Sequence, residues 1–157
     1  MSDLTLIRTN SNNANFIQLV ALLDKDLAVR DGDEHALYAQ FNKVDSIKQV
    51  VVAYQNGMPV ACGAIKPLSE TAAEVKRMFV HPDYRKKGIA AKILTELEAW
   101  ATELTFEECV LETGRKQPEA IALYQKVGYQ VRPNYGQYIG VDNSVCMAKP
   151  LPNSTSK

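Results

Sequence analysis

The stretch from Glu74 to Leu104 constrains the fold of this chain more than any other. Residues 74–80 predict a β strand, and Pro82 ends it because proline has no N–H donor for strand pairing. A long helix follows, since apolar residues recur at steps of four, four, three and four, at Ile89, Ile93, Leu97, Trp100 and Leu104. A strand that leads into a helix with one buried stripe indicates a sheet covered by helices.

The other segments extend this pattern to the whole chain. Further strands are predicted at residues 4–8, 47–54, 60–65, 109–112, 129–132 and 143–149. Further helices are predicted at residues 16–27, 34–42 and 118–127. The dipeptide Asn56-Gly57 suits a tight hairpin turn because both residues tolerate positive φ. The order of elements predicts a single-layer α/β fold with helices on both faces of the sheet.

Size and composition fit one ordinary globular domain. The chain has 157 residues, so we expect a single domain over residues 1–150 and a flexible tail over 151–157. Eighteen basic and eighteen acidic residues balance, so no excess charge favours nucleic acid or an anionic membrane surface. No apolar run reaches the roughly 18 residues of a membrane span, and the first residues do not resemble a secretory signal. We therefore expect a cytoplasmic protein.

The cysteines and histidines of the sequence give little support for a metal site or for redox chemistry. Cys62, Cys109 and Cys146 lie far apart in apolar stretches and form no CxxC pair, so we expect small core residues. A cysteine nucleophile beside His35 or His81 is the alternative. Two histidines 46 positions apart offer little to a metal ion, so no metal site is expected.

The segment from Val80 to Ala90 carries the clearest sign of function. A strand ends, a basic turn follows, and Gly88 stands where the long helix begins. Helix N-termini present free N–H groups and a partial positive charge, which suits an anion. The patterns GxxxxGK[ST] and GxGxxG are absent, so any phosphate is held in another way. An ordinary exposed basic turn is the alternative interpretation.

Arg85-x-x-Gly88-x-Ala90 resembles the pyrophosphate loop of the GNAT superfamily of acyl-CoA-dependent N-acetyltransferases. Residues 120–129, with Tyr124 and Gly128-Tyr129, resemble that family's last helix and the turn after it. The match is specific from about residue 74 to 129, and before that only the element order agrees. The resemblance implies a mixed, mostly antiparallel, splayed sheet of about six to seven strands.

The resemblance also implies a binding site for acetyl-CoA, used as a co-substrate. Backbone N–H groups of residues 86–91 would bind the pyrophosphate, and the main chain around Met78 and Val80 would pair with the pantetheine arm. Gln117 stands where the family often has asparagine, so that contact to the arm would be rearranged or lost. The full set of implied coenzyme-binding residues is Met78, Phe79, Val80, Arg85, Lys86, Lys87, Gly88, Ile89, Ala90, Ala91, Gln117 and Tyr124.

Acetyl transfer to an amine sets two demands on the protein. A protonated amine cannot attack, so a base must take its proton, and Glu74, eleven residues before Arg85, is the candidate. The departing thiolate needs a proton, and Tyr124 matches the family's tyrosine beside the coenzyme sulfur. The alternatives for Glu74 are a solvated strand-end carboxylate or a partner of Lys76 or Arg77, and the alternative for Tyr124 is a packed helix residue. On an unbroken strand, Glu74 points to the same face as Lys76, Met78 and Val80.

The acceptor amine is harder to identify from the sequence. Candidate pocket residues are Tyr38, Glu112, Arg132, Asn134, Tyr135 and Tyr138. Glu112 could hold a cationic amine or pair with Arg115 or Lys116 instead. The sequence thus predicts an N-acetyltransferase acting on a small-molecule or peptide amine, and an edge strand could support a homodimer.

Two rival functions use the same loop. One is a non-catalytic coenzyme A-binding sensor or interaction module on the same fold. The other is a nucleotide- or phosphate-binding protein that uses the same helix N-terminus. Turnover with an amine separates the first from an enzyme, and competition between ATP and acetyl-CoA tests the second.

Overall fold

A computed structural model describes residues 4–31 and 46–152 of the chain. The predicted helix over 34–42, with His35 and Tyr38, lies outside the described residues. The helices are α1 (Ala14–Asp31), α3 (Ile89–Glu103) and α4 (Pro118–Lys126), with short 3-10 turns η2 (Pro82–Tyr84) and η3 (Gly136–Tyr138). The strands are β1 (Leu4–Thr9), β2 (Gln49–Gln55), β3 (Met58–Pro67), β4 (Ala72–Val80), β5 (Glu108–Gly114), β6 (Gln130–Arg132) and β7 (Ser144–Pro150).

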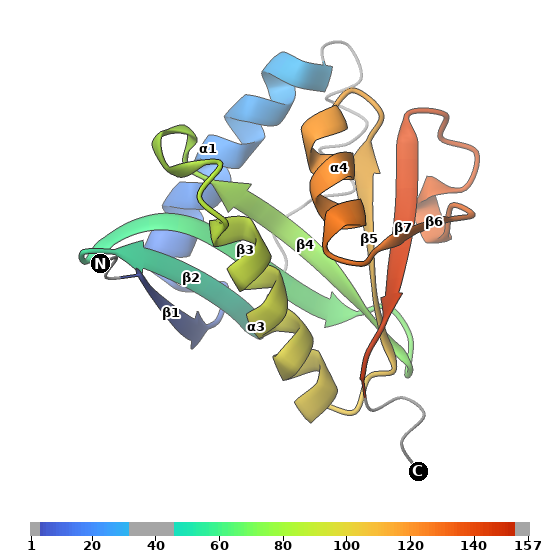
Figure 1. Cartoon of the computed structure of the whole chain (residues 1–157), viewed down its shortest axis with the longest axis horizontal. Coiled ribbons are helices and arrows are strands. Elements are labelled where there is room, and N and C mark those ends of the chain that lie inside the picture. Colours follow the sequence, from blue (N-terminus) through green and yellow to red (C-terminus); the bar gives the residue numbers. More distant parts are fainter. Residues whose placement is uncertain (1–3, 32–45, 153–157) are drawn as a thin grey trace.

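The strands form one seven-stranded sheet in the order β1-β2-β3-β4-β5-β7-β6 (Figure 1). Every neighbouring pair is antiparallel except β4 and β5, which run parallel. The helix α3 connects these two strands, as a parallel pair requires a crossover. The predicted mixed, mostly antiparallel sheet is confirmed.

Helices cover both faces of the sheet, as predicted. On one face α1 packs through Phe16, Leu19 and Val20, and on the other α3 and α4 pack around Leu97 and Tyr124 (Figure 1). The alternation of side chains along β2 feeds both cores. Val50 and Val52 face α1, whereas Val51 and Ala53 face α3.

A β-bulge interrupts β4 at Arg77, whose φ of 61° is unusual for a residue with a side chain. Lys76 pairs with Ala64 and Phe79 with Cys62, so two residues of β4 stand opposite Gly63 alone. The extra residue reverses which face the later side chains point to. Glu74 and Lys76 therefore point to one face, whereas Met78 and Val80 pack against the core under α3.

This bulge corrects one expectation from the sequence. An unbroken strand would place Glu74, Lys76, Met78 and Val80 on one face, and that interpretation is wrong beyond Lys76. Gly63 makes room for the new direction of Met78. A Cβ at Gly63 would lie 2.5 Å from Met78 Sδ and 2.9 Å from Ile93 Cγ2. The glycine thus allows α3, β3 and the bulged strand to approach closely.

The two parallel strands separate soon after they meet. Pairing between β4 and β5 is limited to three positions and ends at Glu74 with Val110. Beyond this point the strands diverge toward their carboxyl ends, with α4 beside β5 (Figure 1). The splayed sheet implied by the resemblance is present, and it opens the cleft described below.

Smaller expectations were also resolved. The Asn56-Gly57 hairpin has φ values of 53° and 84°, as its tight turn requires. The three cysteines are free and buried, which confirms them as core residues.

Leu151 falls in the expected tail but is buried in the core, and its N–H donates to Glu107 O at 2.9 Å. Within residues 4–31 and 46–152, no helix combines the length and apolar character needed to cross a bilayer.

Candidate active site

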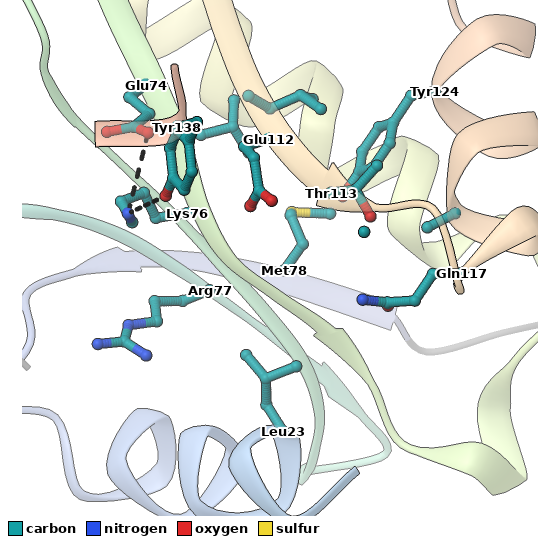
Figure 2. A pocket seen from close by; sticks show the side chains of 14 residues that line it. Leu23, Glu74, Lys76, Arg77, Met78, Glu112, Thr113, Gln117, Tyr124 and Tyr138 are labelled. Atoms are coloured by element: carbon teal, nitrogen blue, oxygen red, sulfur yellow. Dashed lines mark hydrogen bonds and ion pairs between the residues drawn. The ribbon is translucent and has the colours of Figure 1, made fainter. Parts of the chain in front are cut away.

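The divergence of β4 and β5 leaves a cleft of about 140 Å³ through the sheet (Figure 2). Its walls come from both strands, from α4 and the residue that caps it, from Tyr138 of η3 and from Leu23 of α1. The lining residues are Leu23, Glu74, Val75, Lys76, Arg77, Met78, Leu111, Glu112, Thr113, Gly114, Gln117, Ala120, Tyr124 and Tyr138. Six of the residues predicted for the site therefore meet in one place, namely Glu74, Met78, Gln117 and Tyr124 with the acceptor candidates Glu112 and Tyr138.

Tyr124 is buried on α4, and its hydroxyl points into the cleft (Figure 2). The edge of its ring packs against Tyr129, with ring centroids 5.9 Å apart. Burial raises the pKa of the Tyr124 hydroxyl, and the charge of Glu112 raises it further. The phenol therefore stays protonated at neutral pH and can donate a proton.

Glu74 belongs to a buried group that we call the polar cluster, formed by Glu74, Lys76, Tyr135 and Tyr138. Glu74 Oε2 accepts a hydrogen bond of 2.9 Å from the Tyr135 hydroxyl and lies 3.8 Å from Lys76 Nζ. Lys76 Nζ in turn donates to the Tyr138 hydroxyl at 3.4 Å (Figure 2). Glu74 is thus not a solvated strand-end carboxylate, because it is 6% exposed and held by two neighbours.

Glu112 on β5 is a second carboxylate in the cleft. It accepts a hydrogen bond of 2.8 Å from the Ser144 hydroxyl. Figure 2 shows its carboxylate between Tyr138 and Tyr124, pointing toward Met78. Its charge contributes to the raised pKa of both tyrosines. The expected alternative partner Arg115 donates instead to the backbone oxygen of Asp142.

The loop between β4 and α3 has the geometry of an anion site. Gly88 precedes α3 with φ of 80°, and a Cβ there would meet nothing within 4 Å. The space above its backbone is therefore open, and Lys86 and Lys87 are exposed beside it. The helix it begins is fifteen residues long. These features fit a negatively charged group held by backbone N–H groups.

The remaining predicted residues take different places. Arg85 Nε donates to Val80 O at 2.7 Å, and its guanidinium lies over the Phe79 ring. Phe79 and Ile89 bury their side chains in the core, so only their backbone could reach a ligand. Ala90 and Ala91, in the first turn of α3, are half-buried.

Two cleft residues gain a role that the sequence did not indicate. The sequence indicates Lys76 and Arg77 only as partners of Glu74. Both line the cleft, and the bulge lies at Arg77, directly after Lys76. The pattern of an unbroken strand gave no sign of this bulge, because arginine is not a residue that marks positive φ. Among the described residues, no group of three or more His, Cys, Asp or Glu side chains could hold a metal ion.

Comparisons with known proteins agree with this geometry. A family model for the GNAT acetyltransferase domain matches residues 46–131. The chain is 35% identical over 155 residues to an IAA acetyltransferase of Azospirillum brasilense, covering 96% of this chain and 100% of that protein.

Solved structures show the same fold. A Klebsiella pneumoniae structure assigned to the acyl-CoA N-acyltransferases is 34% identical with a TM-score of 0.76, covering 95% of this chain and 98% of that one. A GNAT family acetyltransferase of Elizabethkingia anophelis, solved with acetyl-CoA bound, is 16% identical with a TM-score of 0.66, covering 95% and 99%. The chain therefore belongs to the GNAT superfamily of acetyl-CoA-dependent acetyltransferases.

Proposed function

We propose that this protein transfers an acetyl group from acetyl-CoA directly to a primary amine. The observation that carries the proposal is the cleft between β4 and β5, with the Tyr124 hydroxyl inside it and the Gly88 loop following β4. Acetyl-CoA would place its pyrophosphate on backbone N–H groups at the start of α3. Its pantetheine arm would lie along the edge of β4 beyond Glu74, where the pairing with β5 has ended.

Tyr124 is proposed as the proton donor to the departing thiolate. When the amine nitrogen bonds to the acetyl carbon, the carbon–sulfur bond breaks and the thiolate needs one proton. The raised pKa keeps the Tyr124 proton available at neutral pH. Gln117, at the start of the same helix, lines the cleft and could contact the pantetheine arm.

The proton that leaves the amine goes to a carboxylate, and two carboxylates line the cleft. Glu74 is the residue expected from the sequence, but its Oε2 already accepts from Tyr135 and pairs with Lys76. Glu112 also accepts one hydrogen bond, from the Ser144 hydroxyl, but its carboxylate lies between Tyr138 and Tyr124 and points toward Met78 (Figure 2). We assign the base role to Glu112 and give Glu74 the role of positioning Lys76, while Glu74 as the base is the alternative.

A panel of amines tests the proposed function. Each amine is mixed with the protein and acetyl-CoA, and release of free thiol is followed. Transfer to at least one amine, with an N-acetyl product found by mass spectrometry, is the expected result. Binding of acetyl-CoA without transfer to any amine would favour the sensor instead. Competition by ATP as strong as that by coenzyme A would favour the nucleotide-binding alternative.

A further inference from the structure

The carboxylate to which we assign the base role accepts a hydrogen bond from the neighbouring strand. The Ser144 hydroxyl donates to Glu112 Oε2 at 2.8 Å, and Ser144 is 1% exposed. In the register of β5 and β7, Ser144 pairs with Gly114, two residues along the strand from Glu112. The two side chains are therefore diagonal neighbours on one face of the sheet. The pairing of the two strands brings the hydroxyl to this carboxylate.

The turn before β7 is held at both of its ends, so Ser144 enters the strand in a defined position. Asn134 Nδ2 donates to the backbone oxygens of Tyr138, Val141 and Ser144 at 3.1, 3.3 and 3.2 Å. The Ser144 N–H donates in turn to Val141 O at 3.0 Å. A hydroxyl held in this way loses little further freedom when it bonds to the carboxylate.

Several titratable groups face Glu112 from the elements around it. The charge of Glu112 acts on Lys76 of β4, Tyr124 of α4, Tyr138 of η3 and Cys146 of β7. Glu74 and Arg77 of β4 line the same cleft. Burial raises the pKa of the two tyrosines and of the cysteine, so these three groups stay protonated at neutral pH. Burial lowers the pKa of Lys76, so its titration has to be told apart from that of Glu112.

We propose that Ser144 is a positioning residue that holds Glu112 in place and keeps it ionised as the base. A hydrogen bond donated to an ionised carboxylate favours the ionised form. A general base must be ionised before it can take the proton of the amine. The Ser144 hydroxyl therefore extends the action of Glu112 toward lower pH. This inference rests on the proposed function, in which Glu112 takes that proton.

Carbon-13 NMR of the glutamate side-chain carboxyls tests this without turnover. Loss of one signal in Glu112→Gln identifies Glu112, and its signal is followed from pH 4 to 9 in the wild type and in Ser144→Ala. A carboxyl carbon shifts far more on its own protonation than on that of a neighbour, which separates Glu112 from Lys76. The midpoint should lie at least about half a pH unit higher in Ser144→Ala, the size expected for one hydrogen bond to a charged group. An equal midpoint in the folded variant would overturn the proposal.

Further variants show whether the hydroxyl is the cause. Ser144→Thr keeps the hydroxyl and should keep the wild-type midpoint. Ser144→Cys keeps the size but has a weak S–H donor, so its midpoint should be higher. Ser11→Ala removes another buried hydroxyl, which accepts from the Ile47 N–H at 2.9 Å, and should leave the midpoint unchanged. Equal shifts in Ser11→Ala and Ser144→Ala would overturn the proposal. If Ser144→Ala does not fold, Ser144→Cys decides, because a wild-type midpoint in that protein would overturn it.

The pH dependence of turnover separates this inference from the proposed function. With an amine found in the panel, the acidic limb of kcat/KM should move upward in Ser144→Ala by as much as the NMR midpoint. Ser11→Ala should keep the limb, and the ionisation of the amine itself is the same for every variant. A limb that stays while the midpoint moves would overturn the role of Ser144 in the reaction. If no amine is acetylated, the proposed function fails, while the midpoint still decides whether Ser144 controls Glu112.

Discussion

The Tyr135 hydroxyl donates a hydrogen bond of 2.9 Å to Glu74 Oε2, across 61 positions of the sequence. The bond joins the segment after β6 to the middle of the sheet, at the last pair of β4 and β5. It holds the carboxylate that lies beside Lys76. The arrangement of the polar cluster, and with it the side of the cleft that Glu74, Lys76 and Tyr138 line, therefore depends on this contact.

Replacing Tyr135 should lower stability and change its pH dependence. Tyr135→Phe leaves a buried carboxylate without one donor, which should cost about 1–3 kcal/mol of unfolding free energy at pH 7. Burial, and next the Glu74 charge, raise the pKa of Tyr135 above its ordinary value of about 10. The folded state thus keeps a proton that the unfolded state loses. The contribution of the Tyr135 hydroxyl to the unfolding free energy should be constant below about pH 10 and should fall as pH rises further.

Urea titrations of both proteins from pH 7 to 11 measure this effect. At pH 7 the unfolding free energy of Tyr135→Phe should be lower than that of the wild type. Between pH 10 and 11 it should decline less steeply, because the variant lacks the buried Tyr135 hydroxyl. An identical decline in the two proteins would mean that Tyr135 does not contribute to the alkaline loss.

Gly88→Val should weaken acetyl-CoA binding by at least about tenfold. The new side chain would occupy the open space above the backbone where the pyrophosphate is proposed to lie. Gly57→Val is the matched control, since Gly57 has a similar positive φ of 84° and open space but lies in the hairpin. Both variants carry similar backbone strain. Calorimetry should show a loss of affinity for Gly88→Val only, and equal losses would reject the loop as the binding site.

Tyr124→Phe should lower kcat by roughly 100-fold, within the range of general-acid losses. Acetyl-CoA affinity and melting temperature should change little, because the ring packing against Tyr129 is kept. With acetyl donors whose thiol is more acidic, kcat should fall less, because the departing thiolate depends less on receiving a proton. Tyr54→Phe, on β2, is a control for loss of a tyrosine hydroxyl. Wild-type kcat in Tyr124→Phe would exclude the acid role, and a large drop in melting temperature would assign the hydroxyl to folding.

The two cleft carboxylates should differ in their effect on the pH–rate profile. Glu112→Gln should lower kcat sharply and flatten the acidic limb, because the group that is switched off by protonation has been removed. Glu74→Gln should lower kcat less than Glu112→Gln does, and its pH–rate profile should keep the acidic limb. Steady-state rates from pH 5 to 9 with both variants decide. If the limb disappears in Glu74→Gln instead, Glu74 is the base, as the sequence alone suggests.

Gly63→Ala should destabilise the fold by about 1–3 kcal/mol through overpacking. The added Cβ would lie 2.5 Å from Met78 Sδ and 2.9 Å from Ile93 Cγ2, so either the methionine or α3 must move. Met78→Ala in the same chain removes one of these contacts. The double variant should therefore lose less stability than the two single losses added together. Strictly additive losses in urea titrations would show that the two residues do not compete for space.

The loop and helix features of the site could be predicted from local sequence. Gly88 before a long amphipathic helix, and Tyr124 within a helix that begins at Pro118, depend on short-range rules of capping and periodicity. The structure places both where those rules indicate. The polar cluster could not be predicted in this way, because it brings β4 together with residues some sixty positions later.

Within residues 4–31 and 46–152, the sequence by itself determined the order of strands and helices, the hairpin at Asn56-Gly57 and the glycine at the start of α3. These follow from backbone preferences and apolar spacing, which act over a few residues. Only the tertiary structure decided the bulge at Arg77, because it results from packing between β3, β4 and α3 around Gly63. That one extra residue sets which side chains of β4 face each side of the cleft. It separates Lys76 from Met78, so that Lys76 joins the polar cluster whereas Met78 packs against the core under α3.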